Sequence, residues 1–105
     1  MSEAASGLLR ALLARACVDR DRILLSQFQS TDWQSLTFIG ERHQIQFRIQ
    51  GPEANAIAER MTEGIEDVEF VIRGHLVADI SLAKPLRRNE DGSISVEIEA
   101  LTVAE

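Results

Sequence analysis

Residues 44–61 read QIQFRIQGPEANAIAERM, and two apolar periodicities meet inside this stretch. Up to residue 50, Ile45, Phe47 and Ile49 alternate with polar residues, which is the period of a strand that buries one face. Beyond Gly51 the apolar spacing changes to three and four residues, which predicts an amphipathic helix. Its apolar positions are Ala54, Ile57, Ala58 and Met61. The switch predicts a sheet with helices packed against it.

The ends of this predicted helix carry signals of their own. Pro52 suits the first helical position, where a backbone amide hydrogen has no partner, and Glu53 favours the positive end of the helix dipole. Gly64 stands where a residue in the left-handed conformation ends many helices.

The N-terminal residues 2–19 predict a second amphipathic helix, which Ser2 or Ser6 would cap. Its apolar stripe consists of Leu8, Leu9, Leu12, Leu13 and Ala16. Because each helix has a single apolar stripe, we expect both to lie on the same face of the sheet.

Three strands are expected between the two helices. Residues 22–29 predict the first strand, and residues 35–38 predict the second because Leu36 and Phe38 alternate with polar residues. Residues 40–42 predict a turn into the strand at residues 44–50.

The second half of the chain returns to a period of two. Residues 68–72 and 76–82 keep the same parity across Gly74, which favours one bent strand over two strands joined by a tight turn. Residues 85–92 predict a loop, and residues 93–103 predict the last strand. Leu101 and Val103 shift parity within that strand, which predicts a bulge near Ala100.

The element order is therefore α-β-β-β-α-β(-β)-β. We predict an α+β fold with a mainly antiparallel sheet of five to six strands and two helices on one face. A chain of 105 residues with 45% apolar residues predicts a single domain over residues 1–105.

The charge balance argues against nucleic acid and membrane partners. The chain carries 17 carboxylates and 11 basic residues, for a net charge of −6, whereas phosphate binding depends on Lys and Arg. The order α-β-β-β-α of the first half resembles that of double-stranded-RNA-binding domains. Their second helix begins with basic residues, but here it begins Pro52-Glu53-Ala54 and contains no Lys, so RNA binding is not expected.

Sequence features also predict a cytoplasmic protein. Cys17 is the single cysteine, so no disulfide forms within the chain. No stretch approaches the roughly 20 apolar residues of a membrane span, and the N-terminus lacks the basic region of a secretory signal.

The residues that suit a binding or catalytic site are few. The polar lining of a pocket would draw on Arg42, His43, Arg48, Arg73, His75 and Asp79. A catalytic cluster would need His43, His75 and Asp79 to converge, since His75 and Asp79 are about 13 Å apart along a strand. No metal-ligand spacing or cofactor motif occurs, so we expect no metal and no cofactor.

These features favour a small protein-interaction or self-associating module, with a homodimer as the main expectation. Strong strands with few helices to cover them leave a sheet face or edge available for pairing. The alternatives are a small-ligand-binding domain and a small enzyme that uses the His43/His75/Asp79 cluster.

Overall fold

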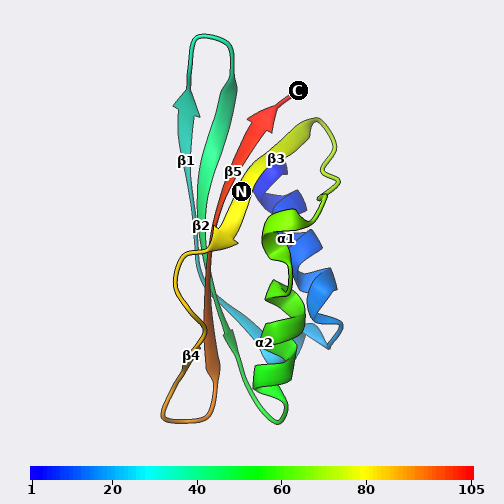
Figure 1. Cartoon of the computed structure of the whole chain (residues 1–105), viewed down its shortest axis with the longest axis vertical. Coiled ribbons are helices and arrows are strands. Elements are labelled where there is room, and N and C mark those ends of the chain that lie inside the picture. The colour runs from blue at the N-terminus through cyan, green and yellow to red at the C-terminus, as the bar shows by residue number, and fades with distance from the viewer.

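The structure is a computed structural model that describes residues 1–105, except for the side chain of Arg20. It is elongated, measuring 46 × 24 × 21 Å, with two helices along one side of a long twisted sheet (Figure 1). The elements in chain order are α1 (Glu3–Ala16), η1 (Arg20–Arg22), β1 (Ile23–Gln34), β2 (Ile39–Ile49), α2 (Ala54–Thr62), η2 (Ile65–Asp67), β3 (His75–Leu82), β4 (Arg87–Arg88) and β5 (Ile94–Ala104).

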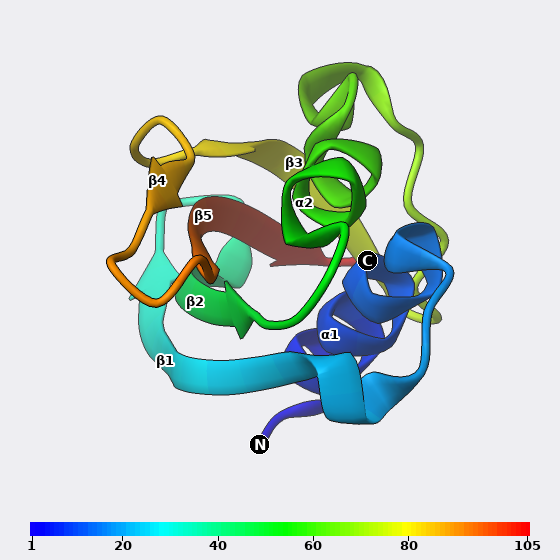
Figure 2. The same cartoon turned by 90° about the horizontal axis from the view of Figure 1, so that it is seen from below.

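The sheet has five strands, all paired antiparallel. The strand order is β1-β2-β5-β3, and the short β4 pairs with β5. Seen along the length of the molecule, both helices lie on the same side of β5 (Figure 2). The predicted α+β class, the antiparallel sheet of five strands and the two helices on one face are therefore confirmed.

The core lies between the helices and the sheet face that they cover, here called the inner face. Ile45, Phe47 and Ile49 of β2 are buried, and the register places them opposite Ile98, Val96 and Ile94 of β5, respectively. The helices contribute the apolar positions that their spacing predicted. These are Leu8, Leu12 and Ala16 of α1 and Ala54, Ile57, Ala58 and Met61 of α2.

Polar contacts fix the ends of the helices. The Ser2 hydroxyl accepts a hydrogen bond from the Ala5 amide, which confirms the N-terminal cap at Ser2. Arg15 donates to the carbonyls of Met61 and Glu63, and Arg60 donates to the carbonyl of Ala16. The C-terminal ends of α1 and α2 are thus held together by charged donors on backbone acceptors, a favourable pairing at a helix C-terminus.

The predicted strand at residues 35–38 is wrong. Residues 35–38 form the loop of a hairpin, in which the Ser35 amide donates to the Phe38 carbonyl over 2.8 Å. The predicted turn at residues 40–42 lies inside β2 instead. Leu36 and Phe38 had the alternation of a strand, but no buried face lies within their reach.

The second half differs from its prediction at Gly74. Residues 68–71 are not a strand, and Ile72 forms only an isolated bridge with His75. Gly74 has a φ of 79°, so the chain turns tightly there rather than continuing as one bent strand. The bulge predicted near Ala100 is wrong, because β5 pairs with β2 without a register shift from Ile94 to Val103. A bulge lies in β3 instead, at Ala78, where the pairing with β5 shifts between Val77 and Asp79.

The second helix begins later than predicted. Glu53 has a φ of 64° and precedes the first helical residue, Ala54, so Pro52 lies outside the helix. Gly64 does adopt the predicted left-handed conformation, with a φ of 59°.

Phe47→Ala is expected to lower the free energy of unfolding by about 3–5 kcal/mol, because Phe47 is fully buried at the centre of the core. Urea denaturation monitored by circular dichroism measures the change. Val71→Ala is the matched control, since Val71 is 95% exposed and its truncation should change stability by less than about 0.5 kcal/mol. Equal losses in the two variants would contradict this position of the core.

Candidate functional site

His43 is the one buried histidine among the residues proposed from the sequence. It points to the inner face of β2, between the neighbouring strands β1 and β5. Its Nδ1 is 2.7 Å from the Ser30 hydroxyl, and its Nε2 is 2.9 Å from the Thr102 hydroxyl. The Phe28 ring packs edge-on against the imidazole, with 5.9 Å between ring centroids. His43 thus joins three strands where the apolar core ends.

The neutral form of His43 satisfies this network. The Ser30 hydroxyl can donate to Nδ1 while Nε2–H donates to Thr102, whose hydroxyl lies 3.5 Å from the Glu41 carbonyl. Burial lowers the pKa of His43 below its usual 6.5, because the buried site disfavours the charged ring. The Glu41 carboxylate raises this pKa and His75 lowers it further, but burial has the largest effect.

A hydroxyl beside a neutral imidazole is the pairing that activates a serine nucleophile. Here the second ring nitrogen contacts a threonine hydroxyl instead of a carboxylate. The largest of the described pockets, of about 530 Å³, includes neither Ser30 nor His43. His43 is therefore a buried histidine with both ring nitrogens hydrogen-bonded. None of the described pockets forms a substrate cleft beside it.

The structure does not bring His43, His75 and Asp79 together. Residues directly opposite in adjacent strands share a face of the sheet. His43 and His75 lie on the inner face, whereas Asp79 is opposite Leu101, on the uncovered outer face. The bulge at Ala78 moves Asp79 to the face opposite that of His75.

The three arginines proposed for a pocket are also separated. Arg42 is exposed on the outer face of β2, in the same cross-strand row as Leu101 and Asp79. Arg48 is paired with Asp91 over 2.8 Å at the other end of β2. Arg73 lies in the turn before β3, so the three side chains line no common cavity in the described part of the structure.

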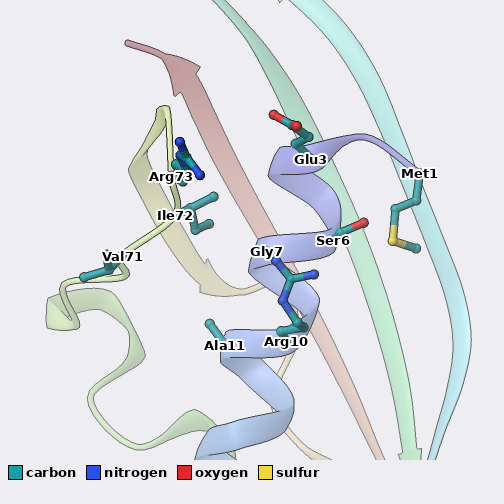
Figure 3. Close-up of a pocket in the computed structure, with 9 residues that line it drawn as sticks. All are labelled: Met1, Glu3, Ser6, Gly7, Arg10, Ala11, Val71, Ile72 and Arg73. Atoms are coloured by element: carbon teal, nitrogen blue, oxygen red, sulfur yellow. The ribbon is translucent and has the colours of Figure 1, made fainter.

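Arg73 does line the 530 Å³ pocket, which lies between α1 and residues 71–73 (Figure 3). Glu3, Gly7 and Arg10 come from α1, and Ile72 comes from the opposite wall. An added Cβ at Gly7 would lie 2.8 Å from Ile72 Cγ2, so the glycine permits this close approach of the two segments. The rim of the pocket is formed by exposed side chains of both charges.

The most unusual surface is the edge of β1 that faces away from β2, here called the β1 edge. β1 has 12 residues and ends the strand order of the described sheet. Ile23 is its one buried residue. Its sequence, ILLSQFQSTDWQ, contains one charged residue, Asp32, and neither Lys nor Pro. Edge strands of monomeric proteins usually carry charged residues, especially Lys, or Pro, because an edge without them pairs with other strands.

Two protective features are present in β1, a bulge at Ser26 and the inward-facing Asp32 near its end. The pairing with β2 shifts between Leu25 and Gln27, and it is continuous from Gln27 to Gln34. The bulge therefore interrupts the β1 edge near its start and leaves the longer part regular.

Exposed apolar side chains gather at the end of the same hairpin. Leu36 is fully exposed, Phe38 is 54% exposed and Ile39 is 66% exposed. The hairpin of β1 and β2 projects past α1 and past the C-terminus (Figure 1). This projection leaves the three side chains without a helix to cover them, a pattern that marks interaction surfaces.

Trp33 lies on the outer face close to this end. It is opposite Gly40, where an added Cβ would lie 2.1 Å from the Thr102 carbonyl oxygen and 2.8 Å from Trp33 Nε1, so glycine permits the close approach of both β5 and the indole. Its Nε1 is buried and has no hydrogen-bond partner among the described atoms. The glycine that predicted a turn from the sequence therefore accommodates a cross-strand contact instead.

Sequence reasoning missed the β1 edge and the hairpin loop as candidate surfaces. The absence of Lys and Pro and the single acid in residues 23–34 were the available signal for the edge. The loop gave a misleading signal, because the alternation of Leu36 and Phe38 is that of a buried strand face.

Comparisons with protein-family models, with curated proteins and with solved structures find no match to this chain. Among the described residues, no group of three or more His, Cys, Asp or Glu side chains is arranged to hold a metal ion. Within the same part of the chain, the helices are too short or too polar to cross a lipid bilayer.

The lowered pKa of His43 predicts a loss of stability in mild acid. The unfolded chain binds a proton near pH 6.5, whereas the folded chain resists it, so the free energy of unfolding should fall as the pH drops from 6.5 toward the folded pKa. Urea midpoints at several pH values between 5 and 8 measure this slope. His43→Gln should flatten it, and His75→Gln should leave most of it in place. An unchanged slope in His43→Gln would contradict the assignment.

Proposed function

We propose that this protein is a self-associating module that forms a homodimer by antiparallel pairing of two β1 edges. The observation that supports the proposal most strongly is the long, nearly uncharged and almost entirely exposed strand at the end of the sheet. A strand of 12 residues presents roughly 40 Å of unpaired backbone donors and acceptors. Pairing with a second strand satisfies these groups with each other rather than with water.

Symmetry favours a second copy as the partner. Two identical strands that pair antiparallel are related by a two-fold axis perpendicular to the sheet, which gives a closed dimer rather than an open chain. The resulting sheet contains both sets of five strands. The same axis places the helices of both protomers on one side of that sheet.

The side chains along the β1 edge suit this arrangement. Gln27, Gln29 and Thr31 alternate on the outer face and carry no charge. On the inner face, Phe28 is half-buried and contacts His43. Two copies therefore meet without opposing like charges, because antiparallel pairing places Asp32, near the end of one β1, beside the uncharged start of the other.

Size-exclusion chromatography with light scattering tests the proposal directly. The protein is expected to elute with twice the chain mass of 11.7 kDa, and Gln29→Lys should shift it toward the monomer. A lysine on an edge strand disfavours strand pairing, and near a two-fold axis it also brings two like charges together.

Gln44→Lys is the matched control. Gln44 is exposed on β2 and lies directly opposite Gln29, so the substitution adds the same charge to the same face one strand further in. It should leave the dimer intact. A parent protein that remains a monomer at high concentration would overturn the proposal. Equal dissociation by both lysines would move the interface from the β1 edge to the outer face.

A further inference from the structure

We infer that, in this homodimer, the hairpin loop of each copy packs into an apolar pocket of its partner. The hairpin loop consists of Ser35, Leu36, Thr37 and Phe38. The pocket lies between α1 and the start of β1, and it is here called the α1–β1 pocket. It is lined by Leu9, Leu13, Ile23, Leu25 and Phe47. The inference rests on the proposed pairing of the β1 edges.

The hairpin loop has a defined shape that presents its apolar side chains to solvent. The Ser35 amide donates to the Phe38 carbonyl over 2.8 Å, and the Phe38 amide donates to the Ser35 hydroxyl over 3.2 Å. These two bonds close the loop on itself. Leu36 at its apex is fully exposed, so its side chain gains no burial from its own chain. An ordered loop loses little conformational entropy on docking, which favours a specific contact.

The α1–β1 pocket is suited to side chains rather than to a small molecule. All five lining residues are apolar, so it offers no side-chain hydrogen-bonding group to orient a polar ligand. Its volume is about 180 Å³, below the roughly 300–1,000 Å³ of typical ligand sites. A leucine or phenylalanine side chain would lose water-exposed surface there against five apolar side chains.

Antiparallel pairing brings the two features together. The hairpin loop follows the last residue of β1, Gln34, whereas the pocket includes Ile23 and Leu25 at the beginning of β1. When two β1 strands run in opposite directions along most of their length, the end of one lies beside the start of the other. The hairpin loop of each copy then reaches the region of its partner's Ile23 and Leu25.

The relative orientation of the two copies also agrees with this docking. The two-fold axis keeps the inner faces of both copies on one side, where α1 contributes Leu9 and Leu13 to the pocket. Ile39, which follows the hairpin loop, is opposite Gln34 on the inner face and is 66% exposed. Ile39 thus presents apolar surface beside the hairpin loop on the side that carries the partner's α1. Neither the loop nor the pocket lining contains a charged residue.

Cross-linking between two differently tagged copies tests the contact. Both carry Cys17→Ser, since Cys17 is exposed and would react itself. One copy then carries Leu36→Cys and the other Leu13→Cys, and a short bismaleimide is added after the two are mixed and allowed to exchange. We expect a covalent heterodimer from this pair. Leu36→Cys with Leu76→Cys should give none, because the exposed Leu76 lies on β3, at the opposite edge of the sheet.

The masses of the uncross-linked mixtures separate the two proposals. Dimers that form no Leu36→Cys to Leu13→Cys cross-link would overturn the docking of the loop and leave the β1 pairing standing. A monomeric mass would overturn both.

Leu36→Asp gives a second measure in the otherwise unmodified chain. It should weaken the dimer at least about tenfold, because a charge would enter an apolar pocket at both symmetric contacts, whereas Leu76→Asp should leave the dissociation constant nearly unchanged. Equal constants for Leu36→Asp and the parent protein would overturn the docking.

Discussion

The alternation of β2 is the constraint on which the rest of the structure depends. Ile45, Phe47 and Ile49 all point to one face, so that face has to be covered along about half of the strand. The two apolar helix stripes supply that cover, and β5 supplies the matching row of Val96, Ile98 and Ile94. A shift of register by one residue would expose this row and bury charged Arg48, which explains why the pairing of β2 with β5 is regular throughout.

The helices cover only part of the sheet, and the inward-facing residues of β2 change from apolar to polar where the helices end. At that boundary His43 occupies the inward-facing position of β2, and the hydroxyls of Ser30 and Thr102 form hydrogen bonds with its two ring nitrogens. A hydrogen-bonded polar residue tolerates the edge of the core better than an apolar side chain with incomplete packing. Further out, Ile39 has the same inward orientation but no cover from its own chain. The hairpin thus passes from buried apolar, through buried polar, to exposed apolar positions along one face.

The parts predicted correctly from the sequence are those that local periodicity determines. The buried positions of α2 and the strand at residues 45–49 follow directly from their spacing. The predictions fail where a residue distant in the sequence determines the local structure. Gly40 lies inside a strand, paired on both sides, where the Thr102 carbonyl and the Trp33 indole approach too closely for a side chain, and spacing does not encode these contacts. Asp79 faces away from His75 because one bulge residue, Ala78, reverses the parity of β3. The candidate catalytic cluster depended on that parity, so a single unpredicted residue was enough to separate it.

Charge distribution limits where two copies of an acidic chain can meet. Each chain carries a net charge of −6, and bringing two together raises their repulsion, although salt screens it beyond roughly 8–10 Å. Close contact is therefore least costly where charged side chains are sparse. Residues 23–31 and the hairpin loop contain none, while β5 carries Glu97 and Glu99 on the outer face and β4 consists of two arginines. The β1 edge thus combines unpaired backbone groups, exposed apolar side chains and low charge, and these three features favour an association between like-charged copies.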